Sequence, residues 1–460
     1  MFSPVALIGQ KNYQMPTPIS NITEASSSPT RSAMALSRFV AAGRSTIQRL
    51  DAREGLSTFW LIASFAVALV LIVLRDPSLF THPQFWAEDG KVWFVQAYDG
   101  GWLHSLTQPL GGYLNTLQRL GAGAALLVPF RWAPLVMLLE GLFFQALPVP
   151  VLLSARCRNW APFSFRLLFA AVYIGIPDAR EVHVLCTNCH WHLAVVEVLL
   201  AFAAVPRSLF GRIFDVFTFV LATVCGPFAV LLMPFLFVFW WIRRQRWSLI
   251  LFSILLVGSG FQLALMRHYQ TARYYRFLGA TVARFIRIVG GNTFLGALRG
   301  STAYGHKEPL WVCTVSFLVG LAIIAYCSRR APLEVRLFFL YCFGILVASL
   351  RSPLVPPTPL PLWEMILHYS GIRYWYFPSL IFLWALLWCA FYARSRLFRT
   401  GGILLALILL QGIIRDWRIP ALEDLHFPEY AAKFEAAPPG TYMKIPLNPQ
   451  PEWFMEITKK

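Results

Sequence analysis

The chain has 460 residues, of which 57% are hydrophobic and only 13% are charged. Soluble domains carry about 25% charged residues, so the composition excludes an ordinary soluble protein and indicates one embedded in lipid. The formal net charge of +18 is typical of membrane proteins, whose cytoplasmic loops collect Arg and Lys. We therefore predict membrane lipids, and no nucleic acid, as partners.

Residues 1–57 form a basic N-terminal segment that we predict to be cytoplasmic and partly disordered. The stretch Ser20–Ser32 is rich in Ser, Thr and Pro, a composition that cannot bury enough apolar surface to fold. The segment lacks the early apolar core of a cleavable signal peptide. A basic stretch follows Met34, which leaves open whether translation starts at Met1 or at Met34.

Residues 58–414 are predicted to form the transmembrane domain. A helix needs about 20 apolar residues to cross the hydrocarbon, and windows of this kind predict an all-α polytopic integral membrane protein with about eleven transmembrane helices. The predicted spans are 58–74, 133–155, 167–177, 191–206, 213–225, 227–242, 248–266, 309–327, 336–350, 376–392 and 401–414.

The segment 114–130 decides the topology, because it is apolar in its second half but carries Asn115, Gln118 and Arg119 at its start. If this segment does not cross, the Arg-rich short loops fall on the cytoplasmic side, as the positive-inside rule requires. If it crosses, all later basic loops lie outside. We therefore predict an amphipathic juxtamembrane helix that lies at the outer surface.

This topology places the N-terminus in the cytoplasm and three larger pieces on the opposite face. These pieces are the outer loops 75–132 and 267–308 and a small extracytoplasmic tail, 415–460. In the tail we predict a helix around Glu429–Ala436 and a strand-like run, Tyr442–Ile445. The tail is too small to fold alone, so we expect it to pack on the outer loops.

Two adjacent carboxylates, Glu88 and Asp89, follow the first span in the sequence Phe85-Trp86-Ala87-Glu88-Asp89-Gly90. Carboxylates at a membrane interface are costly unless they are solvated or used. One of them could accept a proton from a hydroxyl nucleophile. The alternative is an ordinary polar loop in which Asp89 caps the following helix.

The outer loop 267–308 is basic, which runs against the positive-inside rule and needs a reason. Arginine makes bidentate contacts to phosphate, so an anionic lipid headgroup is one explanation. General attraction to anionic lipid, worth about 1 kcal/mol per charge, is the other. The candidate phosphate ligands are Arg273, Arg276, Arg284 and Arg287, with Arg351 and Arg373 beside later spans.

The segment Cys186-Thr187-Asn188-Cys189-His190 fits the c-type haem attachment pattern. Its thiols, with His183, His190 and His192, could also bind zinc, form a disulfide, or simply pack or line a substrate site. Haem is disfavoured because the segment runs directly into a span. We leave the cofactor open, with a divalent metal ion as a candidate and no metal ligands assigned.

Three features together carry a resemblance to a known group of enzymes: the outer acidic pair, the turn Gln108-Pro109-Leu110-Gly111-Gly112-Tyr113-Leu114 into a juxtamembrane helix, and Arg373-Tyr374-Trp375-Tyr376-Phe377-Pro378 at the start of a late span. The chain resembles the GT-C superfamily of membrane glycosyltransferases, which includes protein O-mannosyltransferases and oligosaccharyltransferases. It also looks like an unassigned bacterial branch with similar segments at Thr187–His192 and Gly226-Pro227-Phe228.

The resemblance implies a multi-pass protein of the cell inner (cytoplasmic) membrane that moves a sugar from a polyprenyl-phosphate lipid to a cell-envelope acceptor. It implies an acidic general base, with Asp89 favoured over Glu88, and inversion at the anomeric carbon. Acidic residues after the third span, Asp178 and Glu181, would help to bind acceptor or metal, unless they are only solvated loop charges. Tyr113, Asn188 and Trp191 complete the expected substrate-binding set.

The alternative function is a transporter or flippase for a lipid-linked or anionic solute. Such a protein places charges within its spans, near the middle of the bilayer. The predicted spans hold few charges, chiefly Glu140 and Glu197, and this favours the enzyme.

Overall fold

The computed structural model describes residues 43, 45–269, 277–300, 305–355, 359–368 and 371–460. The chain divides into two units, Met1–Arg49 and Leu50–Lys460. The described residues of the first unit are helical, and the stretch Ser20–Ser32, predicted to be disordered, lies outside the described residues. All of the features below belong to the second unit.

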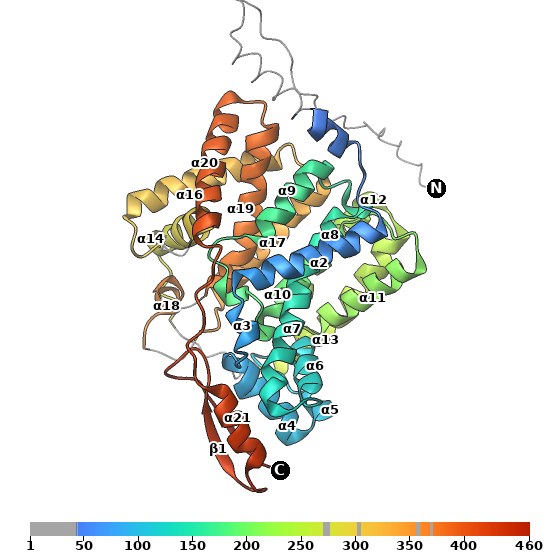
Figure 1. The fold of residues 1–460 in the computed structure, drawn as a ribbon. Helices are drawn as coiled ribbons and strands as arrows, with labels where there is room; N and C mark the ends of the chain where they lie inside the picture. Colours follow the sequence, from blue (N-terminus) through green and yellow to red (C-terminus); the bar gives the residue numbers. More distant parts are fainter. Residues whose placement is uncertain (1–42, 44, 270–276, 301–304, 356–358, 369–370) are drawn as a thin grey trace, which may run out of the picture. The chain divides into compact units, whose positions relative to one another are not determined.

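Every range that was predicted to cross the membrane is helical over most of its length (Figure 1). Seven helical stretches in the described part of the chain are long and apolar enough to span a bilayer: Thr58–Arg75 (α2), Phe130–Leu153 (η2 Phe130–Trp132, α7 Ala133–Ala146 and α8 Pro148–Leu153), Arg246–His268 (α13), Leu310–Ser328 (α16), Leu333–Arg351 (α17), Ile372–Tyr392 (α19) and Arg396–Arg415 (α20). The other predicted ranges hold shorter helices: α9 (Phe163–Ile174), α10 (Cys189–Ala201), α11 (Leu209–Thr223) and α12 (Phe228–Arg243). A helical membrane protein is thus confirmed, whereas the number of about eleven spans remains a prediction.

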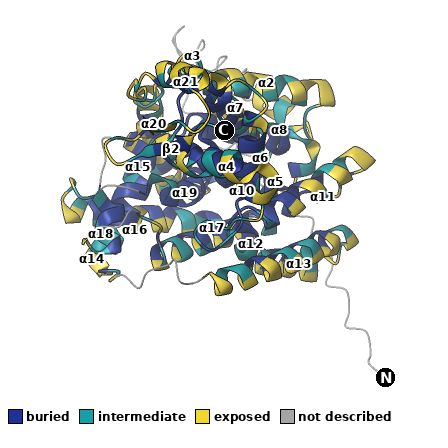
Figure 2. Cartoon of the chain, turned by 90° about the horizontal axis from the view of Figure 1, so that it is seen from below, coloured by how far each residue is buried: buried dark blue, intermediate teal, exposed yellow. Residues whose placement is uncertain are grey.

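The long helices differ in how much of their surface the rest of the protein covers (Figure 2). In the helix α19, 94% of the apolar window is buried, against 17% in α2 and in α20. Apolar side chains need no cover where the solvent is lipid. The helix α19 is therefore the centre of the bundle, where Trp384 packs against Phe165 and Phe169 of α9 with ring centroids 4.9 and 4.7 Å apart.

The first predicted outer loop folds into short helices rather than an open loop. They are α3 (Ser78–Thr81), the π-helix η1 (Asp89–Phe94), α4 (Val95–Gly100), α5 (Trp102–Ser105) and α6 (Thr116–Ala125). The ten residues of α6 rise only about 15 Å, half of the hydrocarbon thickness of about 30 Å, so α6 is too short to cross. Most of its residues are buried against α7 and η1, which makes it a covered helix rather than one lying free on the surface.

The second predicted outer loop, 267–308, contains α14 (Val282–Ile286), the π-helix η7 (Arg287–Leu295) and α15 (Gly296–Arg299). The π-helix lies close against α16. A Cβ atom added at Gly290 would come within 2.0 Å of the carbonyl oxygen of Cys313, so only glycine fits at this position. A further short helix, α18 (Leu362–His368), precedes α19.

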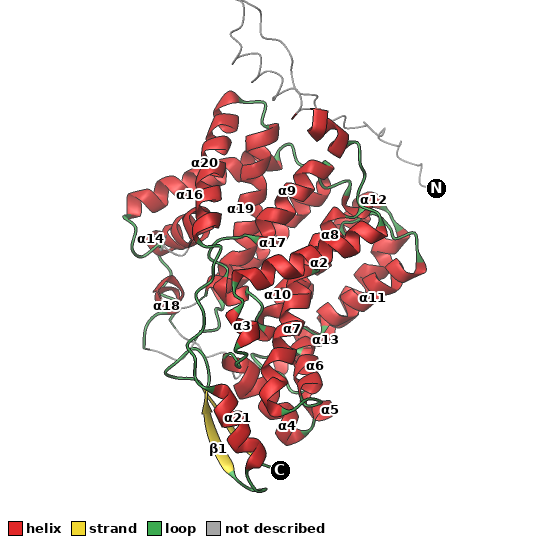
Figure 3. Ribbon diagram, in the orientation of Figure 1, coloured by secondary structure: helices red, strands yellow, loops and turns green. Residues whose placement is uncertain are grey.

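The C-terminal tail forms the helix α21 (Phe427–Ala436) and a two-stranded antiparallel sheet (Figure 3). The strand β1 (Tyr442–Pro446) contains the predicted strand-like run, and its partner is β2 (Phe454–Thr458). Phe427 and Phe434 of α21 share an apolar cluster with Phe85, Phe94 and Phe130 of the first outer loop and η2. This cluster attaches the tail to the segment that carries the acidic pair.

Candidate functional site

The acidic pair lies at the start of η1, directly after a sharp bend of the chain at Ala87. Ala87 has a φ of 33°, an unfavourable value for a residue with a Cβ atom. Its backbone N–H donates to the carbonyl oxygen of Asn448 at 2.6 Å, and the N–H of Asp89 donates to that of Trp86 at 2.6 Å. Local strain of this kind persists only where the surroundings hold it. Glu88 and Asp89 follow this bend as successive residues of helical backbone, and their side chains therefore point in directions about 100° apart.

Asp89 is only 3% exposed and lies near Glu140 of α7. Burial, and next the negative charge of Glu88, raise the pKa of Asp89 well above its ordinary value. The backbone N–H groups of Thr187 and Cys186 oppose this shift, while the charge of Glu140 adds to it. One carboxylate oxygen of Asp89, Oδ1, has no hydrogen-bond partner among the described residues.

Glu88 is partly exposed and lies within electrostatic range of Arg373, at the start of α19, as does Tyr113. The guanidinium of Arg373 forms an ion pair with Glu181, and its backbone N–H donates to Glu181 Oε2 at 3.0 Å. Its Nη2 also donates to the carbonyl oxygen of Leu354 at 2.7 Å. Four residues singled out in the sequence thus converge from four separate segments: Glu88, Tyr113, Glu181 and Arg373.

Asn188 and Trp191 lie beside Glu181 and the start of α19. Asn188 Nδ2 donates to the carbonyl oxygen of Glu181 at 2.6 Å. The indole ring of Trp191 packs against Phe228 at 4.7 Å and against Tyr374 at 6.2 Å, measured between ring centroids. Both side chains are buried, so in this structure they support the site and do not line an open surface.

In the described part of the predicted outer loop 267–308, Arg284 and Arg287 are bound by protein acceptors. Arg284 forms an ion pair with Glu364 at 2.5 Å, and Arg287 Nη1 donates to the carbonyl oxygen of Gly305 at 2.6 Å. Arg351 is exposed at the end of α17. The other two predicted phosphate ligands, Arg273 and Arg276, lie outside the described residues.

Asp178 lines a small polar pocket near the start of α19. Burial, and next the negative charge of Asp416, raise the pKa of Asp178 to about 7. The backbone N–H of Asp178 donates to Asp416 Oδ2 at 3.3 Å. The pocket is also lined by Ile176, Pro177, Asn292, Trp375, Tyr376 and Ser379.

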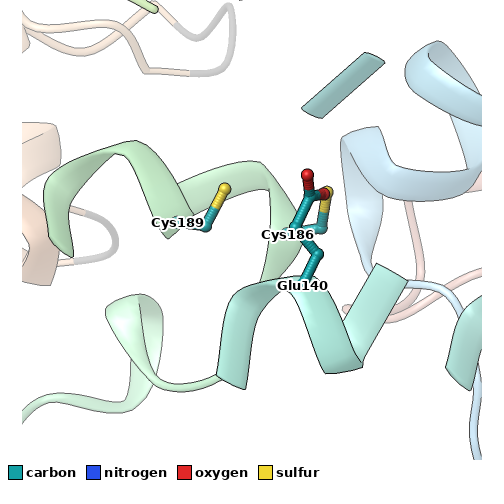
Figure 4. Close-up of side chains that lie close together, drawn as sticks. All are labelled: Glu140, Cys186 and Cys189. Atoms are coloured by element: carbon teal, nitrogen blue, oxygen red, sulfur yellow. The ribbon is translucent and has the colours of Figure 1, made fainter. Parts of the chain in front are cut away.

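The two cysteines of the Cys-x-x-Cys segment lie beside Glu140 and not among the histidines (Figure 4). The two Sγ atoms and a carboxylate oxygen of Glu140 all lie within 4.8 Å of one another. Both cysteines are buried free thiols. The three histidines have other partners: His183 contacts Gln145, His190 contacts Gln118, and His192 contacts Tyr173, Tyr376 and the carbonyl oxygen of Val182.

Three residues near the site were not assigned to it from the sequence: Glu140, Arg119 and Asn448. Glu140 could have been found from the sequence, because a carboxylate within an apolar span needs polar partners and often marks a functional site. Arg119 is fully buried over the ring of Trp93, and its Nη1 donates to Gln96 Oε1 at 2.8 Å. Neither Arg119 nor Asn448 belongs to a local pattern that indicates a site.

The chain matches no protein-family model, and no curated protein matches it. The residues and their geometry therefore carry the functional argument.

Proposed function

We propose that this protein is a membrane glycosyltransferase that moves a sugar from a polyprenyl-phosphate donor to a cell-envelope acceptor on the non-cytoplasmic face. The observation that carries the proposal is that Glu88, partly exposed, lies within electrostatic range of Arg373 at the start of α19. A carboxylate and a guanidinium in one site provide a proton acceptor and a cation for a leaving phosphate.

Glu88 is the better base of the acidic pair. A general base must come within hydrogen-bond reach of the hydroxyl that it deprotonates. Asp89 is 3% exposed and lies among Glu140 and the backbone of Cys186 and Thr187, so an acceptor hydroxyl has no access to it in this conformation. The resemblance favoured Asp89 as the base, but the burial of Asp89 favours Glu88.

In the proposed reaction, Glu88 takes the proton of the acceptor hydroxyl while the hydroxyl oxygen forms a bond to the anomeric carbon of the sugar. The bond between that carbon and the phosphate oxygen breaks, and the lipid phosphate leaves with the electron pair. Arg373 is the cation that stabilises the leaving charge. A single displacement with one carboxylate as base inverts the anomeric carbon.

One observation favours the transporter or flippase as a second candidate. Glu197 of α10 is fully buried, and neither of its carboxylate oxygens has a partner among the described residues. Buried carboxylates in apolar helices often mark ion pathways. The charge of Glu197 acts on the hydroxyl of Tyr341 in α17, which could form part of such a pathway.

The test is transfer from polyprenyl-phosphate hexoses and pentoses to envelope acceptors by the purified protein in nanodiscs. We expect Glu88→Gln to lower transfer by about 10²–10⁴-fold, the usual contribution of a general base. Asp99→Asn, an exposed carboxylate of the same outer segment, is the matched control and should retain transfer. If Glu88→Gln transfers as well as Asp99→Asn, the mechanism is wrong. Solute flux that requires Glu197 would then put the transporter first.

A further inference from the structure

A carboxylate and two thiols form a second group of side chains, which lies next to the proposed site but takes no part in the proposed reaction. Glu140 comes from α7, Cys186 opens the 3-10 turn η5 (Cys186–Asn188) and Cys189 opens α10. The Sγ atom of Cys186 lies 3.1 Å from Glu140 Oε2, and all three donor atoms lie within 4.8 Å of one another (Figure 4).

These separations approach those of a bound metal ion. With Zn–S near 2.3 Å and Zn–O near 2.1 Å, tetrahedral zinc holds its ligand atoms roughly 3.5–3.8 Å apart. Shifts of about 1 Å would therefore close the group around one ion. Two cysteines separated by two residues also have the ligand spacing of structural zinc sites, and here the turn η5 brings both thiols to the same carboxylate.

Asp89 provides a second, independent observation. Its side chain is 3% exposed, and its Oδ1 accepts no hydrogen bond among the described residues. Its charge reaches both Cys186 and Cys189. A buried polar atom without a partner is costly and needs an explanation, and an ion at the site is one of the standard explanations.

We propose that Glu140, Cys186 and Cys189 bind one divalent transition-metal ion of the zinc class, and that Asp89, which lies outside this group of three in the structure, moves in as the fourth ligand. Two thiolates select a soft or borderline ion over magnesium or calcium. Binding releases the thiol protons to solvent, and the backbone N–H groups of Thr187 and Cys186 stabilise the charged form of Asp89. Four protein ligands make a closed site, which is structural rather than catalytic.

Such an ion would connect α7, the start of α10 and the bend of the acidic pair. It would hold Asp89 in place and thereby orient the neighbouring Glu88. The proposal stands on the geometry of Glu140, Cys186 and Cys189 and on the buried, unpartnered Oδ1 of Asp89. It does not depend on the glycosyltransferase activity, because metal binding can be measured without a sugar donor.

The experiment measures metal in the full-length protein, purified in detergent from cells grown with added zinc. We expect about one zinc ion per chain by elemental analysis, and a thiolate-to-cobalt charge-transfer band after exchange with Co²⁺. The double variant Cys186→Ser/Cys189→Ser should lose both signals. The matched control, Cys327→Ser/Cys389→Ser, changes another buried pair of neighbouring thiols and should keep both.

A chelator provides a readout that does not require the variant to fold. Removing the metal from the wild-type protein should lower its thermal unfolding temperature and make two more thiols reactive. Substoichiometric zinc together with no cobalt band would overturn the proposal. So would a cobalt band that persists in the Cys186→Ser/Cys189→Ser variant, or a chelator that changes neither stability nor thiol reactivity.

Discussion

The backbone N–H of Ala87 donates a hydrogen bond to the carbonyl oxygen of Asn448 at 2.6 Å, which connects the bend of the acidic pair to the C-terminal tail. Asn448 is buried, and its Nδ2 donates in turn to the carbonyl oxygen of Glu423 at 2.9 Å. Gln84 Nε2 donates to the same oxygen at 3.1 Å. The tail is therefore part of the support of the acidic pair.

Replacing Asn448 with Ala should loosen this support. The variant loses the hydrogen bond to Glu423, and we expect it to lower the free energy of unfolding by about 1 kcal/mol. The tail should also become more sensitive to protease. Glu452→Ala, at an exposed tail position, is the control. Equal protease sensitivity in the two variants would show that Asn448 does not hold the tail.

The helices were largely predictable from the sequence, and the contacts of the site were not. A long apolar window leaves few alternatives to a helix in lipid, so every predicted span range carries one. The strand β1 was predicted from Tyr442–Ile445, but its partner β2 was not. Pairing between two short strands depends on contacts that no local pattern specifies.

The same limit applies to the charged residues. The sequence could mark Arg284 and Arg373 as basic residues near spans, but their roles depend on partners distant in the chain. Arg284 forms an ion pair with Glu364, 80 residues further along the chain, and Arg373 forms one with Glu181. Successive side chains of a helix point about 100° apart, so different surroundings for Glu88 and Asp89 could be predicted, but the burial of Asp89 rather than Glu88 depends on contacts distant in the chain.

Arg373→Ala should destabilise the protein because it leaves Glu181 without its cation and removes the charge beside Glu88. Removing one partner of a fully buried pair costs about 3–5 kcal/mol. The side chains of Arg373 and Glu181 are 23% and 15% exposed, so we expect about 1–3 kcal/mol after allowing for solvent screening. Thermal unfolding in detergent measures the change.

The double variant Arg373→Ala/Glu181→Gln should recover part of this loss, because it removes the uncompensated carboxylate as well. Arg415→Ala is the control: the side chain of Arg415 is 43% exposed and its Nε lies 3.8 Å from Asp416 Oδ1, so the loss of stability should be small. If Arg373→Ala is as mild as Arg415→Ala, the ion pair with Glu181 does not hold the site together.

The predicted orientation can be tested at Pro438, which is exposed in the turn between α21 and β1. All eight native cysteines are buried, so a Pro438→Cys variant should provide a distinct labelling site. An impermeant thiol reagent added to intact cells with a permeable outer barrier should label it. Labelling only after the inner membrane is opened would place the tail in the cytoplasm and contradict the orientation.

Asp178 should make stability depend on pH between about 4 and 7. Its pKa is raised from 3.8 to about 7 in the folded protein, so over this range the folded state keeps a proton that the unfolded chain has lost. Stability therefore falls as pH rises through this window. The contribution of Asp178 is fully present below pH 4 and is lost once the pH exceeds about 7.

The comparison of wild type with Asp178→Asn isolates this effect, because the amide keeps the shape and does not titrate. We expect the unfolding temperature of the wild type, relative to that of Asp178→Asn, to decrease from pH 5 to pH 7 and to level off above. The negative charge of Asp416 is the second cause of the raised pKa of Asp178. In Asp416→Asn, the decrease of the unfolding temperature with pH should therefore occur at lower pH than in the wild type. A relative unfolding temperature that rises with pH would mean that Asp178 is ionised and stabilised in the folded protein, contrary to its buried surroundings.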